Sequence, residues 1–501
     1  MKQLTISFIL FFIGFVFFGI YSLMGIDLHH DGIMFTAAVD VANGCSVFKE
    51  TFSQYGILPP LLQGLAVKIF GAELIVLRLL TAFFYGLSLV VFDLVMRRFF
   101  TSKEYFYRIF SLFLFLCLSP DLCVTSHPWS SVYALFFLLL TIYFTLCYFE
   151  EEKTHIKFAL ASGMTTAIVF GFRQPCGVTT IMAVSAIAIM SILLSEKNTK
   201  KFILGFSGGL LAILAIYAIL ITYWGAWQDY WIQSWKNIFA FAIKRGAGDG
   251  SINGVMINFF PFVSDDRGFV DSIFAFFPLL TLIVFAKLML THSWKNNFSL
   301  VILLVYSLSA WHQYYPVPCM RHIYWASIPM LGVFAIVIKQ LFQKGNLKGK
   351  VAIILLLLIL FPAIAMRSYF GFVRLKNIIP YSTIELPGLR GLHLYNHEKE
   401  FCQIMYNIIQ TIPADIIQRG VFNHTPDGVW SVVFPSCKIK HPMFCRLGGD
   451  VYSNYDKYAL QYCMKNKPIV ISTVWENLPD YSKIQELFYN GYTYYILRPL
   501  K

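Results

Sequence analysis

Long, continuous apolar segments alternate with short polar ones along most of the chain. Segments such as 203–223 and 351–364 are uninterrupted and do not alternate between apolar and polar positions. A run of about 20 apolar residues predicts a membrane-spanning helix, because a helix satisfies its own backbone hydrogen bonds in lipid. Strands of a membrane barrel would alternate instead. The pattern therefore predicts a polytopic α-helical membrane protein.

Eleven segments are predicted to cross the membrane. They are 4–24, 73–96, 107–118, 131–149, 158–172, 178–194, 202–223, 273–290, 298–310, 323–338 and 351–365. The segment 59–70 is shorter than the ~20 residues that a crossing needs, so it is predicted to lie in the interface. Lys and Arg concentrate in alternate loops, which predicts a cytoplasmic N-terminus and, after an odd number of crossings, an external C-terminus.

The last segment, 367–501, is more polar and mixes two kinds of pattern. Runs typical of strands lie at 429–434, 469–473 and 494–497, and runs typical of helices at 400–409, 455–464 and 481–488. We predict a small extracytoplasmic α/β domain that follows a transmembrane domain of residues 1–366. In an oxidising compartment its four cysteines permit one or two disulfides, for example between Cys437 and Cys445.

Composition excludes the soluble cytosolic enzymes. The chain is 57% hydrophobic and 13% charged, against roughly a quarter charged in ordinary soluble domains. Its 40 Lys and Arg against 27 Asp and Glu give a net charge of +13, but most basic residues lie in short loops and therefore indicate topology, with no nucleic-acid partner. Neither a P-loop nor a dinucleotide fingerprint occurs, which disfavours a cytoplasmic nucleotide-sugar donor.

Carboxylates and imidazoles cluster in the first external loop, 25–57. Asp27, His29, His30 and Asp31 precede a predicted short helix, 33–41, that ends before a helix-stop pair of asparagine and glycine. Such a cluster can supply proton-transfer groups at the membrane surface. The alternative is a solvated loop in which Asp31 merely caps the helix.

Several motifs of this region resemble a known family. They are Asp31-Gly32, Ala37-Ala38, Asn43-Gly44, Gln54-Tyr55-Gly56-Ile57-Leu58-Pro59, Phe70-Gly71-Ala72-Glu73 and Leu77-Arg78-Leu79. In order and spacing they resemble the N-terminal module of the GT-C superfamily, polytopic glycosyltransferases that use polyprenyl-phosphate-linked sugars. The likeness covers residues 1–150 and is closest to the bacterial branch related to protein O-mannosyltransferases and the lipid A aminoarabinose transferase.

The resemblance implies a membrane glycosyltransferase domain with its catalytic residues in the first external loop and a further external loop at 224–271. It implies transfer from a polyprenyl-phosphate sugar to a hydroxyl of a glycan, lipid or protein on the periplasmic side of a bacterial inner membrane. Asp31 corresponds to the catalytic base, and Asp27, Asp40 or Asp121 are the candidates to substitute for a second carboxylate. Gly32 stands where relatives often have glutamate, so the second carboxylate of the family pattern is absent here.

Transfer from a lipid phosphate also needs cations for the departing phosphate. Arg173, Arg321 and His322 lie at predicted external helix ends and are the candidates for binding it. The alternative for the two arginines is snorkelling to lipid head groups. Tyr55 and His127, together with the histidines of the first loop, are predicted to line the substrate site.

Metal use stays open, because Asp31, His29 and His30 can bind a divalent cation while arginines alone can neutralise a phosphate. Two other functions remain alternatives. An O-antigen polymerase or ligase would depend on the later external arginines Arg245 or Arg267. A lipid-linked-sugar flippase or secondary transporter would be expected to carry charged groups at the midplane of the membrane, where this chain has few.

Overall fold

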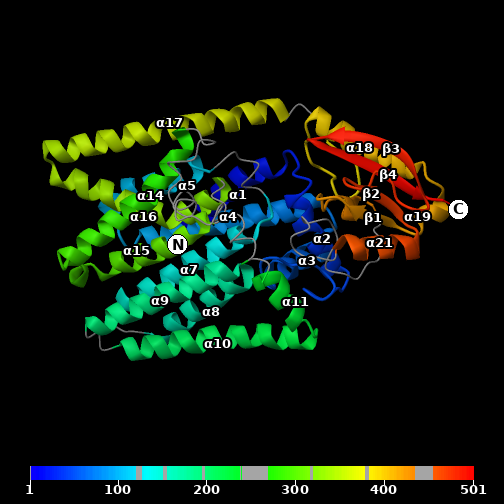
Figure 1. Cartoon of the computed structure of the whole chain (residues 1–501). Coiled ribbons are helices and arrows are strands. Elements are labelled where there is room, and N and C mark those ends of the chain that lie inside the picture. Colours follow the sequence, from blue (N-terminus) through cyan, green and yellow to red (C-terminus); the bar gives the residue numbers. More distant parts are fainter. Residues whose placement is uncertain are drawn as a thin grey trace, which may run out of the picture.

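The structure, a computed structural model, consists of a helical bundle joined to a small C-terminal domain that contains a sheet (Figure 1). It describes residues 2–119, 127–150, 155–194, 198–236, 239, 269–315, 320–378, 383–434 and 455–500. The chain is a polytopic α-helical membrane protein, as predicted. In Figure 1 the helices α2 and α3 lie between the bundle and the C-terminal domain.

Each predicted crossing coincides with a helix. These are α1 (Lys2–Ser22), α4 (Leu74–Met96), α5 (Tyr105–Cys117), α7 (Ser130–Glu150), α8 (Ile156–Phe172), α9 (Gln174–Leu193), α10 (Thr199–Tyr223), α14 (Phe269–Leu290), α15 (Phe298–Ala310), α16 (Met320–Lys344) and α17 (Leu347–Ile378). Among the described residues, seven helices are long and apolar enough to span a membrane: α1, α4, α7, α9, α10, α16 and α17. The predicted number of eleven crossings is therefore not confirmed.

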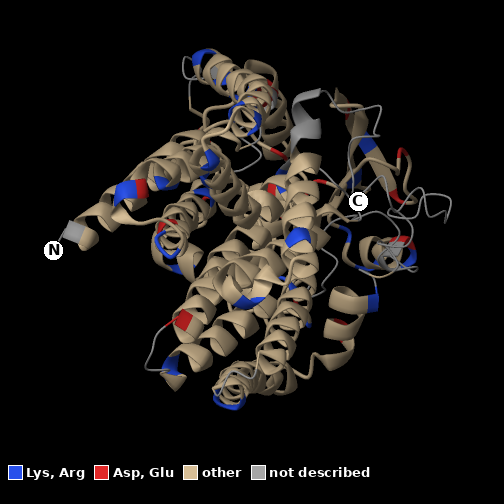
Figure 2. Ribbon diagram, turned by 90° about the vertical axis from the view of Figure 1, so that its left-hand side faces the viewer, with Lys and Arg blue, Asp and Glu red and all other residues tan. Residues whose placement is uncertain are grey.

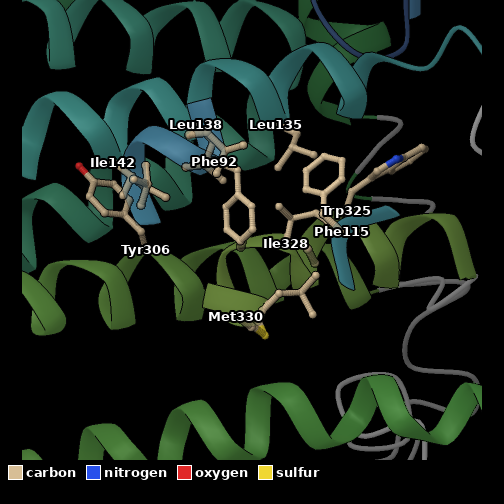
Figure 3. Packing of buried hydrophobic residues seen from close by; sticks show 14 of the residues in the cluster. Phe92, Phe115, Leu135, Leu138, Ile142, Tyr306, Trp325, Ile328 and Met330 are labelled. Atoms are coloured by element: carbon tan, nitrogen blue, oxygen red, sulfur yellow. The ribbon is translucent and has the colours of Figure 1, made fainter. Parts of the chain in front are cut away.

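Burial separates these seven helices into two groups of three, with α9 half buried between them. α1, α10 and α17 bury less than a quarter of their apolar spans, whereas α4, α7 and α16 bury more than half. Figure 3 shows side chains of α4, α5, α7, α15 and α16 meeting in one apolar core, among them Phe92, Phe115 and Trp325. The exposed apolar faces of α1, α10 and α17 are thus left for lipid.

Glycines allow α8 and α10 to approach closely. A Cβ at Gly163 would lie 2.0 Å from the carbonyl oxygen of Phe206, and one at Gly209 would lie 2.1 Å from that of Leu160. Small residues at such contacts let two backbones touch, which is a common way of packing helices in membranes. Because glycine has no side chain, these positions allow the backbone of α10 to pack directly against that of α8.

Basic residues mark the end of the bundle opposite to the C-terminal domain. Figure 2 views the molecule from this end and shows Lys and Arg at helix ends, while most of the other residues are uncharged. Asp93, which is buried in α4, accepts hydrogen bonds from Nε of Arg97 (2.7 Å) and contacts Nε of Arg108 (2.9 Å). Two arginines on one carboxylate hold α4 and α5 together at this end.

The C-terminal domain is built around a mixed sheet. Its strands β1 (Val421–His424), β2 (Ile469–Ser472), β3 (Tyr481–Tyr489) and β4 (Tyr492–Pro499) are arranged in the order β1-β2-β4-β3. β1 pairs with β2 in parallel, and the other pairs are antiparallel. The helices around it are α18 (Asn396–Gln410), α19 (Ala414–Ile417), α20 (Trp430–Val433) and α21 (Tyr455–Asn466).

Two of the predicted elements in this domain are wrong. The segment 481–488, predicted as a helix, is strand β3, because it pairs with β4 across a turn at Asn490 and Gly491, both with positive φ. Such a pair is the characteristic turn of a two-residue hairpin. The segment 429–434, predicted as a strand, contains the helix α20, and strand β1 was not predicted. The predicted strands at 469–473 and 494–497 and helices at 400–409 and 455–464 are confirmed.

The boundary predicted after residue 366 falls within α17, which continues to Ile378. Of the segment 224–271, predicted to be external, the structure describes residues 224–236 with the short helix α11 (Trp227–Trp231), residue 239, and residues 269–271 at the start of α14. Asp121, Lys244, Arg245, Arg267, Cys437 and Cys445 lie outside the described residues. Cys402 and Cys463 are buried in the C-terminal domain and form no disulfide with another described residue.

Candidate active site

The first loop, 25–57, contains a short helix as predicted, α2 (His30–Ala42), which is followed by α3 (Leu58–Phe70). Asp27, and not Asp31, satisfies the free backbone groups at its start. Oδ1 of Asp27 accepts hydrogen bonds from the backbone N–H groups of His29 (3.1 Å) and His30 (2.9 Å). Asp31 lies within the first turn of α2, so the alternative in which it caps the helix is wrong.

Asp31 is fully buried, and both of its oxygens are engaged. Oδ2 accepts a hydrogen bond from Nη2 of Arg78 at 2.5 Å, and Oδ1 lies 2.7 Å from Nδ1 of His127. Burial alone would raise the pKa of Asp31, but the charges of Arg78 and His127 hold it well below its usual range. Asp31 therefore anchors α2 to α4 as a permanent anion.

Arg78 is the partner that the sequence analysis did not assign to the site. Its side chain is 1% exposed, and Nη1 donates to the carbonyl oxygens of Met24 (3.1 Å) and Gly25 (2.9 Å) at the end of α1. An arginine inside an apolar helix is costly and usually has a specific partner. That rule, applied to α4, could have identified Arg78.

Asp27 is the accessible carboxylate of the loop. Its side chain is 33% exposed, and Oδ2 lies 2.7 Å from Nδ1 of His30, whose side chain is 32% exposed. Nε2 of His127 lies 3.8 Å from the same oxygen. Burial would raise the pKa of Asp27, but the hydrogen bond and charge of His30 and the charge of His127 keep it well below its usual range.

The pKa of His30 is lowered, like that of its partner Asp27. Burial lowers the pKa of His30, and the charges of Arg321 and His29 lower it further, against the opposing hydrogen bond and charge of Asp27. At neutral pH the imidazole is then uncharged, with the proton on Nδ1 shared with the carboxylate. Nε2 has no hydrogen-bond partner among the described residues, so it is available as a proton acceptor.

Trp129 connects this pair to the two predicted phosphate-binding arginines. Its ring centroid lies 5.3 Å from that of His30, and the guanidinium of Arg321 lies 5.5 Å from it. The ring of Trp129 also contacts the ring of Tyr55. The guanidinium of Arg173 lies 5.2 Å from the ring centroid of Tyr55. The structure thus brings Arg173 and Arg321 together with Tyr55, His30 and Trp129.

Arg173 also donates a hydrogen bond to the hydroxyl of Ser131 at 2.5 Å. The other predicted residues, His322 and His29, have partners of their own. His322 packs against Trp325 of its own helix, with ring centroids 5.8 Å apart. Nδ1 of His29 lies 2.5 Å from the carbonyl oxygen of Pro426, to which it donates, and so ties the loop to the C-terminal domain.

The C-terminal domain is seated directly on this loop. The hydroxyl of Thr36 donates to the carbonyl oxygen of Gly428 (3.0 Å), and a Cβ at Gly32 would lie 2.1 Å from the backbone nitrogen of Val429. This close approach explains why residue 32 is a glycine. A larger side chain would push the domain away from α2.

A cavity of about 440 Å³ lies where the loop and the domain meet. Its lining residues are Ile26, Asp27, Leu28, His29, His30, Pro426, Asp427, Tyr489, Asn490, Tyr492 and Tyr494. The volume lies in the range of small-molecule sites, about 300 to 1,000 Å³. Asp27 and His30 are the predicted catalytic-loop residues that reach it along with His29, whereas Asp31 does not.

Among the described residues, no group of three or more His, Cys, Asp or Glu side chains is arranged to hold a metal ion. Both oxygens of Asp31 are already used by Arg78 and His127. His29 is bonded to a backbone carbonyl, and His30 to Asp27. The donor set predicted for a divalent cation is therefore committed to other partners.

No protein-family model matches the chain, and no curated protein matches it. Solved structures do. ArnT of Cupriavidus metallidurans with bound undecaprenyl phosphate is 11% identical with a TM-score of 0.58, over 99% of this chain and 97% of that one. The apo oligosaccharyltransferase of Archaeoglobus fulgidus is 13% identical with a TM-score of 0.57, over 93% and 69%.

A second structure of the archaeal enzyme, AglB in complex with an inhibitory peptide and a dolichol-phosphate, is 12% identical with a TM-score of 0.56. It matches 93% of this chain and 69% of that one. Identities at this level carry information about the fold alone. Together with the arrangement of loop, bundle and C-terminal domain, they show that this chain has the GT-C fold.

Proposed function

We propose that this protein is a membrane glycosyltransferase that moves a sugar from a polyprenyl-phosphate donor to a hydroxyl of a glycan, lipid or protein. The GT-C fold supports the class of enzyme, and two structures with this fold were solved with undecaprenyl phosphate and dolichol phosphate bound. The observation that carries the proposal is the paired Asp27 and His30 at a cavity, with Arg321 over the adjoining Trp129 and Arg173 over Tyr55.

The base of the reaction is the pair of Asp27 and His30. Nε2 of His30 takes the proton of the acceptor hydroxyl, whose oxygen attacks the anomeric carbon of the donor sugar. Asp27 holds the proton on Nδ1 and stabilises the imidazolium that forms. The pair replaces Asp31, which has no exposed surface. Asp31 is a positioning residue, because it fixes His127 and the start of α2.

The bond between the anomeric carbon and the phosphate oxygen breaks as the new glycosidic bond forms, and the polyprenyl phosphate leaves with the electron pair. Arg321 is placed to neutralise this phosphate, since it lies over Trp129 and acts electrostatically on His30. Arg173 supports the same region from the side of Tyr55. Preorganised cations of this kind stabilise charge that develops in the transition state.

We place the site on the periplasmic side of a bacterial inner membrane. The Lys and Arg that lie at the bundle end opposite to the C-terminal domain support this orientation (Figure 2), because cytoplasmic loops retain positive charge. The first loop and the domain 367–501 would then both be external, with the N-terminus of the chain in the cytoplasm.

The test uses purified protein in lipid and a set of radiolabelled polyprenyl-phosphate sugars. We expect wild type to release sugar from one of them, to water or to an envelope acceptor fraction. Asp27→Asn and His30→Gln should each lower the rate about 100-fold or more, since a positioned base contributes about 10² to 10⁴. Thermal unfolding should be little changed in both variants.

Asp31→Asn serves as the contrasting variant. It leaves Arg78 buried without its counter-charge, which costs about 3 to 5 kcal/mol, so its main effect should be a lower unfolding temperature. A fully active, well-folded His30→Gln would overturn the assigned base. No consumption of any donor by wild type would overturn the transferase itself, and transport of lipid-linked sugar across the membrane would then be measured.

A further inference from the structure

The cavity between the first loop and the C-terminal domain has two kinds of wall. One wall comes from the loop and carries Asp27 and His30. The other comes from the C-terminal domain and carries Asp427 and the tip of the hairpin between β3 and β4. The residues of this second wall have no part in the proposed proton transfer. Their chemistry therefore indicates which class of ligand the cavity binds.

Asp427 is fixed in position at the back of the cavity. Its side chain accepts a hydrogen bond from the hydroxyl of Tyr494, and its backbone carbonyl accepts one from Nδ2 of Asn423 (2.8 Å). Its backbone N–H donates to the hydroxyl of Thr425 (3.1 Å). A carboxylate held this firmly can accept hydrogen bonds from a ligand at a defined place.

The hairpin tip supplies aromatic rings and an amide. Tyr489 is held by stacking on Phe401, with centroids 4.0 Å apart and planes 6° apart. Asn490, which follows it in the turn, can both donate and accept hydrogen bonds, and Tyr492 is 48% exposed. Rings that pack against apolar C–H faces, beside groups that bond hydroxyls, form a surface suited to carbohydrate.

The cavity wall, as far as the structure describes it, has no lysine or arginine. Arg173 and Arg321 do not line it. A phosphate or carboxylate entering the cavity would approach Asp27 and Asp427 without a compensating cation, which is unfavourable. An uncharged sugar bears no such cost.

We propose that this cavity is the acceptor subsite and that it binds an uncharged glycosyl unit, whose hydroxyl it presents to Asp27 and His30. The proposal rests on the proposed glycosyltransferase function and selects one class from its three open acceptors. His30 is shared by the two halves of the site, since it lines the cavity and also packs against Trp129 beside Arg321. The donor phosphate therefore binds on the side of His30 that faces Trp129 and Arg321, and the acceptor on the side that faces the cavity.

The experiment measures three things on full-length protein in lipid: release of donor sugar to water, transfer to methyl glycosides of common hexoses and N-acetylhexosamines, and transfer to the 6-phosphates of the same sugars. We expect transfer to uncharged glycosides and at least tenfold less to their phosphates. Tyr492→Ala should raise KM for the glycoside at least tenfold. The matched control is Phe488→Ala, a 76% exposed ring of the same hairpin that does not line the cavity, which should leave it unchanged.

Binding without donor gives a readout separate from turnover. Saturation-transfer NMR with the same methyl glycosides should give signals that Tyr492→Ala weakens and Phe488→Ala does not. Equal or better transfer to the phosphates, an unchanged KM in Tyr492→Ala, or transfer to lipid or peptide hydroxyls alone would overturn the acceptor assignment while the transferase function stood. Absence of donor release in every arm would instead overturn the proposed function, and this assignment with it.

Discussion

At the scale of single residues, two aspartates four positions apart have different surroundings. Asp31 is enclosed by Arg78 and His127, whereas Asp27 faces a cavity and pairs with His30. The loop motif marks both as candidates, and the contact with Arg78 decides between them. A carboxylate neutralised by a buried arginine is a structural anchor, while one that orients an accessible imidazole can assist proton transfer.

The pH dependence of activity should report on His30. Because its pKa lies below the ordinary value of about 6.5, the neutral base persists at neutral pH, and kcat/KM should fall only as the pH drops below that value. Arg321→Gln removes a cation that lowers this pKa, so the acidic limb should move to higher pH. Asp27→Asn removes the anion that raises it, so the limb should move to lower pH.

Measurement of kcat/KM between pH 4 and 8 on wild type, Arg321→Gln and Asp27→Asn checks this prediction. The pH at which the rate falls can be compared even where a variant has a lower maximal rate. A limb that stays in place in both variants would mean that another group is the base.

At the scale of elements, the bundle depends on backbone contacts as much as on apolar side chains. Gly209→Ala should separate α10 from α8, because the new Cβ would lie 2.1 Å from the carbonyl oxygen of Leu160. Overpacking of this kind costs about 1 to 3 kcal/mol. We expect a lower unfolding temperature in detergent, measured by differential scanning fluorimetry.

Gly208→Ala is the matched control, since its nearest neighbour would be a side-chain carbon of Leu160 at 3.9 Å. It adds the same methyl group to the same helix and should leave the unfolding temperature within about 2 °C. Equal destabilisation by both changes would mean that helix propensity, and not the contact between α8 and α10, limits the stability.

At the scale of the whole molecule, the C-terminal domain completes the site by closing on the first loop. Gly32→Ala should weaken this closure, because its Cβ would lie 2.1 Å from the backbone nitrogen of Val429. We expect faster proteolysis of the domain and a loss of about 1 to 3 kcal/mol. Gly19→Ala, whose Cβ would meet its nearest atom at 4.0 Å, should behave as wild type. Unchanged proteolysis in Gly32→Ala would show that the domain closes without this contact.

The proposed orientation can be tested on the whole chain in cells. Alkaline phosphatase, which is active after export, should be active when fused after Lys501 and inactive when fused after Gly345, in the turn between α16 and α17. Green fluorescent protein at the same two positions should give the reverse pattern. The opposite result would place the C-terminal domain and the first loop in the cytoplasm.

Much of this protein follows from the sequence by itself. Hydrophobic runs locate the membrane helices, because lipid demands apolar side chains and satisfied backbones wherever a chain crosses it. The first-loop motif singles out the region that we propose to be catalytic, and the asparagine and glycine at 490–491 encode a hairpin although the periodicity of 481–488 resembles that of a helix. These signals are local, so one segment is enough to show them.

The tertiary structure decided what each group does. That Asp31 is buried depends on Arg78, 47 positions away, and that the cavity exists depends on Asp427 and Tyr492, about 400 positions beyond the loop. Burial, charge pairing and cavity shape are produced by contacts between distant segments, and no local pattern records them. The choice of Asp27 with His30 over Asp31 therefore required the fold.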